Sequence, residues 1–304
     1  MRRLFRWVQS HRWRTAFGVL GLIAITCIAI AWRDTMADPV VRRTEVIMPG
    51  LPAGTPPITV VLMSDLHVAN PDMPPSRLAR IVGQVNDLRP DYVLIAGDLI
   101  TNRQLATKLY TYREALAPLS GLKAKQGTFV VLGNHDHWRD PAEALRELEK
   151  LGLTTLVNDY AERGPLIIAG LDDDMTQNAD IGALIAKLPQ QHGRTVVFSH
   201  GPDVFPKLPT DMPLTLAGHT HCGQVRYPWG GSPAYMSNYG DRYACGRIDE
   251  NGRTLIVTAG LGVSVLPFRF LVKPDVWLVT LRAPSQPTVQ TQNGAQTSAR
   301  TPPR

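Results

Sequence analysis

The sequence predicts an α/β fold: a layered domain of two mixed β-sheets flanked by helices, preceded by a single transmembrane helix. Short apolar runs alternate with helical patterns from residue 58 onward and then give way to strand-rich sequence, which predicts the layered sheets. An uncharged apolar run near the N-terminus predicts the membrane helix. The 304 residues are enough for one large domain with its own core.

Residues 1–33 are expected to form a basic cytoplasmic terminus and a membrane anchor. The run 15–32 contains no charge, and a helix of that length spans about 27 Å, close to the thickness of the hydrocarbon core. Arginines precede the run, whereas acids accompany the arginines after it, so the positive-inside bias places the body outside the cytoplasmic membrane. A cleaved signal peptide is the alternative, but Thr35-Met36-Ala37 is a poor cleavage site and the run exceeds the usual length.

The net charge of +6 comes from this N-terminal segment. Residues 1–33 hold six arginines and no acid, whereas 34–282 hold 24 basic and 26 acidic residues. A basic protein would ordinarily suggest a nucleic-acid partner, but the body has no basic excess, so we expect none. Three cysteines exclude a disulfide scaffold, and the 22 residues between Cys222 and Cys245 neither require nor forbid a bond between them.

The chain between the anchor and the C-terminal tail alternates strands with helices. Buried strands are expected at 58–63, 92–96, 128–132, 166–169, 195–198, 214–217, 255–257 and 276–281. Helices are expected at 76–88, 103–119 and 141–151, the last with Asp140 as N-cap and Pro141 at the first helical position. Proline and glycine in 34–57 predict a linker before the domain at 58–282, and 283–304 is expected to be a disordered tail.

Polar residues gather directly after these apolar runs, where loops at strand ends collect functional groups. One such patch is compatible with an ordinary loop end, but five in one order indicate a site. Their glycines at 97, 133 and 218 allow tight turns and a close approach to phosphate. The patches are Ser64-Asp65-Leu66-His67, Gly97-Asp98, Gly133-Asn134-His135-Asp136, Ser199-His200 and Gly218-His219-Thr220-His221.

The residue types in these patches are those of metal ligands. Asp65 and His67 are two apart, so on an extended strand end both can reach one ion. The two oxygens of Asp98 can bridge two cations. Mixed nitrogen and oxygen ligation favours Mn, Fe or Zn over Ca or Mg. The candidate ligands are Asp65, His67, Asp98, Asn134, His200, His219 and His221.

The motifs D-x-H, G-D, G-N-H-D, a lone H and G-H-x-H, in that order, resemble the calcineurin-like metallophosphoesterase superfamily over 58–282. The runs AGHTHCGQVRYP, NYGDRYACGRI and GLGVSVLPFRF resemble its bacterial membrane-associated branch, which includes phosphodiesterases and UDP-2,3-diacylglucosamine hydrolases. Cys222 stands where that branch usually has glycine. The resemblance implies a sandwich of the metallophosphoesterase type.

The resemblance also implies two metal sites, with Mn favoured, that share Asp98 as a bridge. A hydroxide bridging the metals would attack phosphorus, and His135 would stabilise the developing charge or protonate the leaving oxygen. Asp136 would support the site from behind. One metal would take Asp65, His67 and His221, and the other Asn134, His200 and His219.

Other residues are weaker candidates. Arg226 and His137 lie close to the motifs and are candidate substrate contacts. The acidic run 172–174 is expected to be a solvated turn. The apolar stretch 263–270 is expected in the core, with an apolar entrance for a lipid-linked substrate as the alternative.

We therefore expect a dinuclear metal-dependent phosphoester hydrolase, a phosphodiesterase or pyrophosphatase. Tethering at a bilayer favours a lipid-linked substrate over a free nucleotide. The alternative is a membrane-anchored protein that binds metal and phosphate ligands without turnover. All expected ligands are present, which favours the enzyme, and the sequence does not indicate the oligomeric state.

Overall fold

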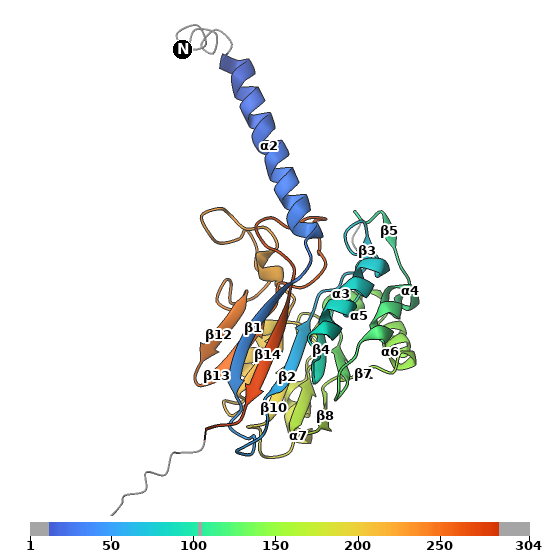
Figure 1. The fold of residues 1–304 in the computed structure, drawn as a ribbon, viewed down its shortest axis with the longest axis vertical. Helices are drawn as coiled ribbons and strands as arrows, with labels where there is room; N and C mark the ends of the chain where they lie inside the picture. The colour runs from blue at the N-terminus through green and yellow to red at the C-terminus, as the bar shows by residue number, and fades with distance from the viewer. Residues whose placement is uncertain (1–11, 103–104, 286–304) are drawn as a thin grey trace, which may run out of the picture.

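In the computed structural model, which describes residues 12–102 and 105–285, two six-stranded mixed sheets pack face to face (Figure 1). The first sheet has the order β1 (Val40–Ile47), β14 (Asp275–Arg282), β2 (Ile58–Met63), β4 (Tyr92–Ala96), β6 (Thr128–Val131) and β7 (Thr154–Thr155). The second has the order β12 (Gly246–Glu250), β13 (Arg253–Val257), β11 (Leu214–Ala217), β10 (Thr195–Phe198), β9 (Leu166–Gly170) and β8 (Asp159–Arg163). Strands β3 (Ala69–Asn70) and β5 (Lys108–Leu109) form a separate two-stranded antiparallel sheet.

Helices cover the outer faces of both sheets, so the domain has four layers. Apolar side chains of both inner faces, such as Leu94 and Phe198, form the central core, and two further cores lie under the helices. This arrangement confirms the predicted fold class. Cover for the first sheet comes from α3 (Pro75–Asp87), α4 (Tyr112–Leu116), η1 (Ala117–Gly121) and α6 (Pro141–Lys150), and cover for the second from α7 (Ile181–Lys187) and η2 (Pro202–Lys207). The short helix α5 (Asn134–Arg139) follows β6 and lies against α6.

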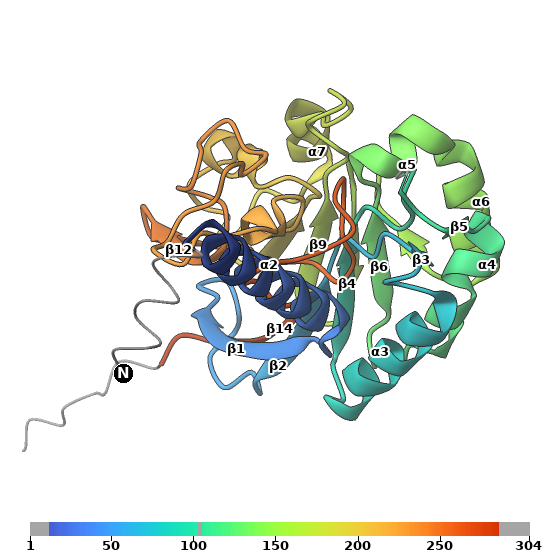
Figure 2. The same ribbon diagram turned by 90° about the horizontal axis from the view of Figure 1, so that it is seen from above.

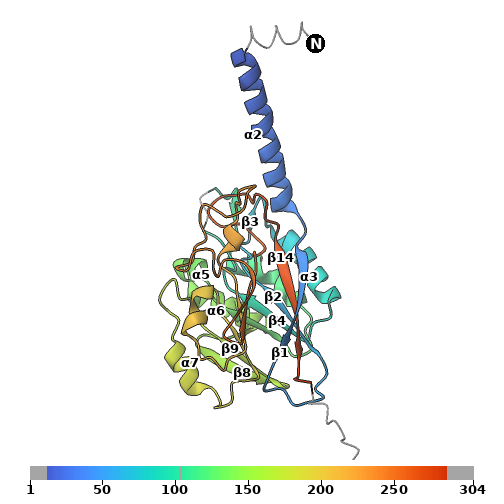
Figure 3. The same cartoon turned by 90° about the vertical axis from the view of Figure 1, so that its left-hand side faces the viewer.

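Helix α2 (Arg12–Met36) projects away from the domain (Figures 1 and 3). By length and composition, it is the one helix in the described part of the chain that is long and apolar enough to cross a membrane. Its surface is exposed apart from the last two turns. There the Thr35 hydroxyl accepts from the Arg269 backbone N–H at 2.7 Å, and the Asp34 carboxylate accepts from the Leu271 N–H at 2.9 Å. The end of α2 is therefore fixed to the domain.

Two expected elements are wrong. Within the expected linker, Val40–Ile47 forms strand β1, which pairs in parallel with β14 and buries Val46. Because β1 is an edge strand, most of its side chains are exposed, and its two arginines interrupt the alternation of apolar and polar residues that would identify a strand. The helix expected at 103–119 is replaced by β5, α4 and η1, because a capping box at Thr111 begins a helix only there. The expected tail 283–304 and the expected cytoplasmic terminus lie largely outside the described residues.

The strand directions place one end of the sheets beside α2. Strand β1 begins directly after α2, and β14 runs parallel to β1. Strand β2 is antiparallel to β14, while β4 and β6 run parallel to β2. The loops that follow β2, β4 and β6 therefore lie at the end of the domain from which α2 leaves (Figure 2).

Candidate metal centre

Five loops meet at this end of the two sheets and bring the predicted polar patches together. Three follow β2, β4 and β6 of the first sheet, and two follow β10 and β11 of the second. The seven candidate ligands lie at the meeting point, and all are buried except His219, which is partly exposed. Five of them have left-handed backbone, with φ of 52° at Asp65, 44° at His67, 53° at Asp98, 68° at His219 and 50° at His221. Such strain in non-glycine residues collects at functional sites.

One group of donor atoms is formed by Asp65, His67 and His221. The Asp65 Oδ1 atom lies 3.4 Å from His221 Nε2 and 4.0 Å from His67 Nε2. The two imidazole Nε2 atoms are 3.2 Å apart. Burial, reinforced for His221 by Arg269, lowers the pKa of both histidines well below the ordinary value. Both are therefore neutral at pH 7, the form of imidazole that binds divalent metals.

A second group surrounds His200. Its Nε2 atom lies 3.0 Å from both Asn134 Oδ1 and His219 Nδ1 and 3.3 Å from Asp98 Oδ2. Its Nδ1 donates to the Ala96 carbonyl at 2.8 Å. The other ring nitrogen, Nε2, therefore points toward Asn134, His219 and Asp98, and it carries either a lone pair or a proton. Burial opposes protonation, but the Asp98 carboxylate raises the pKa of His200 well above its ordinary value. A cation beside Nε2 would take the place of that proton.

Asp98 connects the two groups. Its Oδ2 atom lies 3.4 Å from His67 Nε2 in the first group and 3.3 Å from His200 Nε2 in the second. Its Oδ1 accepts from the His135 backbone N–H at 2.8 Å. Burial would raise its pKa, yet His200 and His67 hold the pKa of Asp98 well below the usual range. The carboxylate is therefore charged and placed between two sets of nitrogen and oxygen donors, which fit divalent metals.

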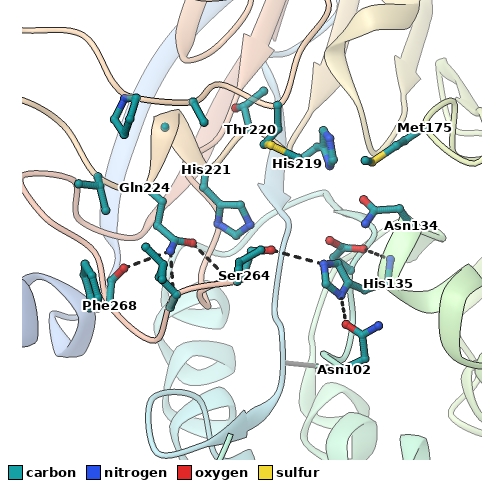
Figure 4. A pocket seen from close by; sticks show the side chains of 18 of the residues that line it. Asn102, Asn134, His135, Met175, His219, Thr220, His221, Gln224, Ser264 and Phe268 are labelled. Atoms are coloured by element: carbon teal, nitrogen blue, oxygen red, sulfur yellow. Dashed lines mark hydrogen bonds between the residues drawn. The ribbon is translucent and has the colours of Figure 1, made fainter. Parts of the chain in front are cut away.

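His135 stands beside both groups at the floor of a cavity (Figure 4). Its Nδ1 donates to Asn102 Oδ1 at 2.8 Å, because an amide oxygen only accepts. Its Nε2 lies 3.4 Å from the Ser264 hydroxyl. Asn102 and Ser264 are not among the predicted residues, although Asn102 stands four residues after Asp98 in the same loop. The pair holds the His135 ring with Nε2 available to a ligand.

Asp136 ties the loops together from below. Its carboxylate accepts from the backbone N–H groups of Leu99 at 3.2 Å and Gly133 at 3.0 Å, and from the Tyr112 hydroxyl at 3.3 Å. Burial and the neighbouring charge of Asp98 raise the pKa of Asp136 to about 7. It contacts Tyr112 and two backbone N–H groups rather than the donor groups, so its effect on the site is to position Asp98 and Asn134.

The two candidate substrate contacts lie elsewhere. The His137 ring pairs with Asp172 at 2.7 Å, which raises the pKa of His137. Arg226 lines a second cavity, which is described below. The expected solvated acidic turn is wrong for Asp172 and Asp173, which are buried because Asp172 binds His137 and Asp173 accepts from Thr176 N–H and hydroxyl at 2.7 Å.

A cavity of about 760 Å³ opens over the two donor groups. Asp98, Asn134 and His221 form its polar floor, and its walls are largely apolar. Asn134 and His221 are labelled in Figure 4. The stretch 263–270 is not simply core, since Val265 is 72% exposed and lines this cavity. The larger apolar side chains of the wall also include Leu105, Trp138, Met175, Met236, Leu266 and Phe268.

The structure joins Cys222 to Cys245 in a disulfide, the pairing that the sequence left open. Cys222 directly follows His221 and has a left-handed φ of 52°. Glycine, which is usual at this position in the branch that the sequence resembles, adopts that conformation without strain. The disulfide therefore holds the backbone beside a candidate ligand in a conformation that cysteine otherwise rarely takes.

Glycine at 218 is required by close packing against the first donor group. A Cβ atom there would clash with the Ser64 hydroxyl and lie 2.5 Å from Asp65 Oδ2. We expect Gly218→Ala to displace Asp65 and lower metal affinity by about 10- to 100-fold, measured by titration of metal-free protein. Gly83→Ala is the matched control, because nothing lies within 4 Å of a Cβ at that position in α3. Equal metal affinity in the two variants would contradict the prediction.

Comparison with known proteins agrees with this site. The family model for calcineurin-like phosphoesterases matches residues 58–223, so the chain belongs to that family. It is a metal-dependent phosphoester hydrolase, with clustered histidines and aspartates as metal-binding groups.

Relatives in distant organisms share most of the chain. An uncharacterized metallophosphoesterase of Bacillus subtilis, YkuE, is 31% identical over 242 residues, covering 77% of this chain and 82% of the relative. A transmembrane protein with metallophosphoesterase domain from Danio rerio is 30% identical over 283 residues, covering 87% of this chain and 62% of the relative. An uncharacterized metallophosphoesterase of Helicobacter pylori is 27% identical over 266 residues, covering 84% and 68%.

Proposed function

We propose that the protein is a membrane-anchored phosphodiesterase or pyrophosphatase that uses two divalent metals, with manganese favoured, on a lipid-linked substrate. The observation that carries this proposal is the position of Asp98, whose one oxygen lies 3.4 Å from His67 Nε2 and 3.3 Å from His200 Nε2. Asp65, His67 and His221 would hold one metal. Asn134, His200 and His219 would hold the other, with Asp98 shared. When bound, two divalent cations supply an activated water and neutralise the charge of the phosphate.

The protein's own groups orient the substrate and move its proton. The floor residues place the phosphoester below the apolar walls, next to His135. Asn102 keeps the His135 ring in position with a proton on Nδ1. In its doubly protonated form, His135 would pass the Nε2 proton to the leaving oxygen as the P–O bond breaks, which leaves a neutral ring that still carries the Nδ1 proton. The products are a phosphate monoester and the protonated leaving alcohol from a diester, or two phosphates from a pyrophosphate.

The cavity walls and the position of α2 support a lipid-linked substrate. Apolar side chains beside a charged floor suit a molecule that joins a phosphoester to an apolar group. The loop that carries Val265 and Phe268 continues into Arg269 and Leu271, which hold the end of α2. If α2 crosses the bilayer, the cavity opens beside the membrane surface, where a lipid-linked substrate is concentrated.

Hydrolysis assays on the full chain test the proposed activity. We expect turnover of bis-p-nitrophenyl phosphate that disappears with a chelator and returns with Mn²⁺. Among diesters with one headgroup, acylated substrates should exceed deacylated ones in kcat/KM by about 100-fold, as burial of several methylenes allows. No metal-dependent turnover on mono-, diester or pyrophosphate substrates would instead favour the non-catalytic binding protein. Equal kcat/KM for the acylated and deacylated diesters would contradict the lipid-linked substrate but not the hydrolytic activity.

Orientation in the membrane is tested separately. We propose a single pass with the N-terminus in the cytoplasm and the catalytic domain outside, because arginines precede the apolar run. Alkaline phosphatase, which is active only outside the cytoplasm, should be active when fused after Leu51. If the fusion is inactive and becomes active when the early arginines are replaced, the protein has the opposite orientation to the one proposed.

A further inference from the structure

A second cavity, of about 350 Å³, lies at the end of α2, apart from the candidate metal centre. Arg33 and Asp34 of α2 form one side, and Arg42 of β1 forms another. Arg226 and Lys273 complete its charged lining, and Leu271 and the Cys222–Cys245 disulfide add apolar surface. The volume falls within the range of small-ligand sites, about 300–1,000 Å³.

The charges lining this cavity do not balance. Four of its side chains are cations and one is an acid. Arg33 pairs with Asp34 at 2.9 Å, and Arg42 pairs with Asp275 at 2.6 Å. Within the described ranges, no carboxylate lies within ion-pair distance of Arg226 or Lys273. Two positive charges are therefore left to attract an anion.

The position of the cavity indicates which anion is at hand. Arg33 ends the apolar run of α2, and Trp32, half exposed, precedes it as aromatic residues do at membrane interfaces. If α2 spans the bilayer, the cavity lies in the headgroup layer, where phosphate is the abundant anion. Guanidinium and ammonium groups both bind phosphate, the former with two parallel hydrogen bonds.

We propose that this cavity binds the phosphate of an anionic phospholipid, whose acyl chains would lie along α2. The inference rests on the proposed membrane anchoring, but it concerns a site that the hydrolytic reaction does not use. A lipid held there would contact the loop that joins Arg269 to Lys273 and so brace the end of α2 against the domain. Arg226, a sequence candidate for substrate binding, would instead bind this structural lipid.

Native mass spectrometry of the full chain in nonionic detergent tests the proposal. Phosphatidylglycerol should be retained at one molecule per chain with an apparent Kd about tenfold below that of phosphatidylcholine. The double variant Arg226→Ala, Lys273→Ala should bind phosphatidylglycerol about tenfold more weakly. Arg226→Lys with Lys273→Arg should restore binding, which separates lost charge from misfolding. The control Arg113→Ala, Lys123→Ala removes two exposed cations that do not line the cavity and should bind as wild type.

Two further arms separate the sources of phosphate and the two sites. Glycerol phosphate should compete poorly; if it binds as tightly as the lipid, the cavity is a site for soluble phosphate and the lipid proposal is overturned. Asp98→Asn should retain phosphatidylglycerol fully, since Asp98 lies in the other cavity. Loss of retention in Asp98→Asn, or unchanged retention in the Arg226 and Lys273 double variant, would also overturn the proposal.

Discussion

Asp98→Asn is expected to lower kcat/KM for metal-dependent phosphoester hydrolysis by about 10³-fold. Asp98 Oδ2 lies 3.4 Å from His67 Nε2 and 3.3 Å from His200 Nε2, so its charge faces both donor groups at once. Asparagine keeps the shape and can still accept from the His135 backbone N–H, but it removes the negative charge. The fold should therefore remain while both metals are held more weakly.

Rates and metal content measured on the same samples separate the possible outcomes. Under saturating Mn²⁺, the wild type should hold about two ions per chain and the variant one or none. Asp87→Asn is the matched control, because Asp87 is exposed at the end of α3. A variant with the wild-type rate would remove Asp98 from the mechanism, and a wild type that holds only one ion when fully loaded would exclude the dinuclear site.

The donor groups could be predicted because each is a local pattern at the end of a buried strand. Asp65 and His67 follow β2 and Asp98 follows β4, and parallel neighbours in one sheet bring such loops to the same edge. Apolar runs identify those strands because both of their faces are buried between layers. Adjacent strand ends then place these side chains together, whereas His200, His219 and His221 join them only because the second sheet packs against the first.

The remaining features depend on contacts that no local pattern records. Ser264 reaches His135 across 129 residues of sequence. Arg269 is a charged residue, which suggests the surface, yet it is fully buried because its guanidinium donates to the Ala259, Gly260 and Gly262 carbonyls. Strand β1 carries two exposed arginines, Arg42 and Arg43, and resembles a linker until β14 pairs with it. Tertiary pairing decides each of these cases.

His135→Ala is expected to lower kcat by about 10²- to 10³-fold while leaving the metal content unchanged. His135 Nδ1 donates a hydrogen bond to Asn102 Oδ1 at 2.8 Å, which leaves Nε2 to donate a proton to the leaving oxygen. The loss should depend on the leaving group. Diesters of simple alcohols need a proton and should lose the full factor, whereas a p-nitrophenolate leaves without one and should lose about tenfold.

Metal content is the decisive companion measurement, because the His135 side chain also lies within reach of His67 and Asp98 as a possible third donor group. If His135→Ala loses bound metal and loses activity on both substrates by the same factor, His135 is a metal ligand rather than a proton donor. Asn102→Ala provides the matched control for positioning: it keeps the imidazole but frees its ring, so we expect a smaller loss, about tenfold, with the same dependence on the leaving group. If His135 is a proton donor held in place by Asn102, His135→Ala should lose more activity than Asn102→Ala. If His135 is a metal ligand, His135→Ala should lose the ion, and neither variant should show a dependence on the leaving group.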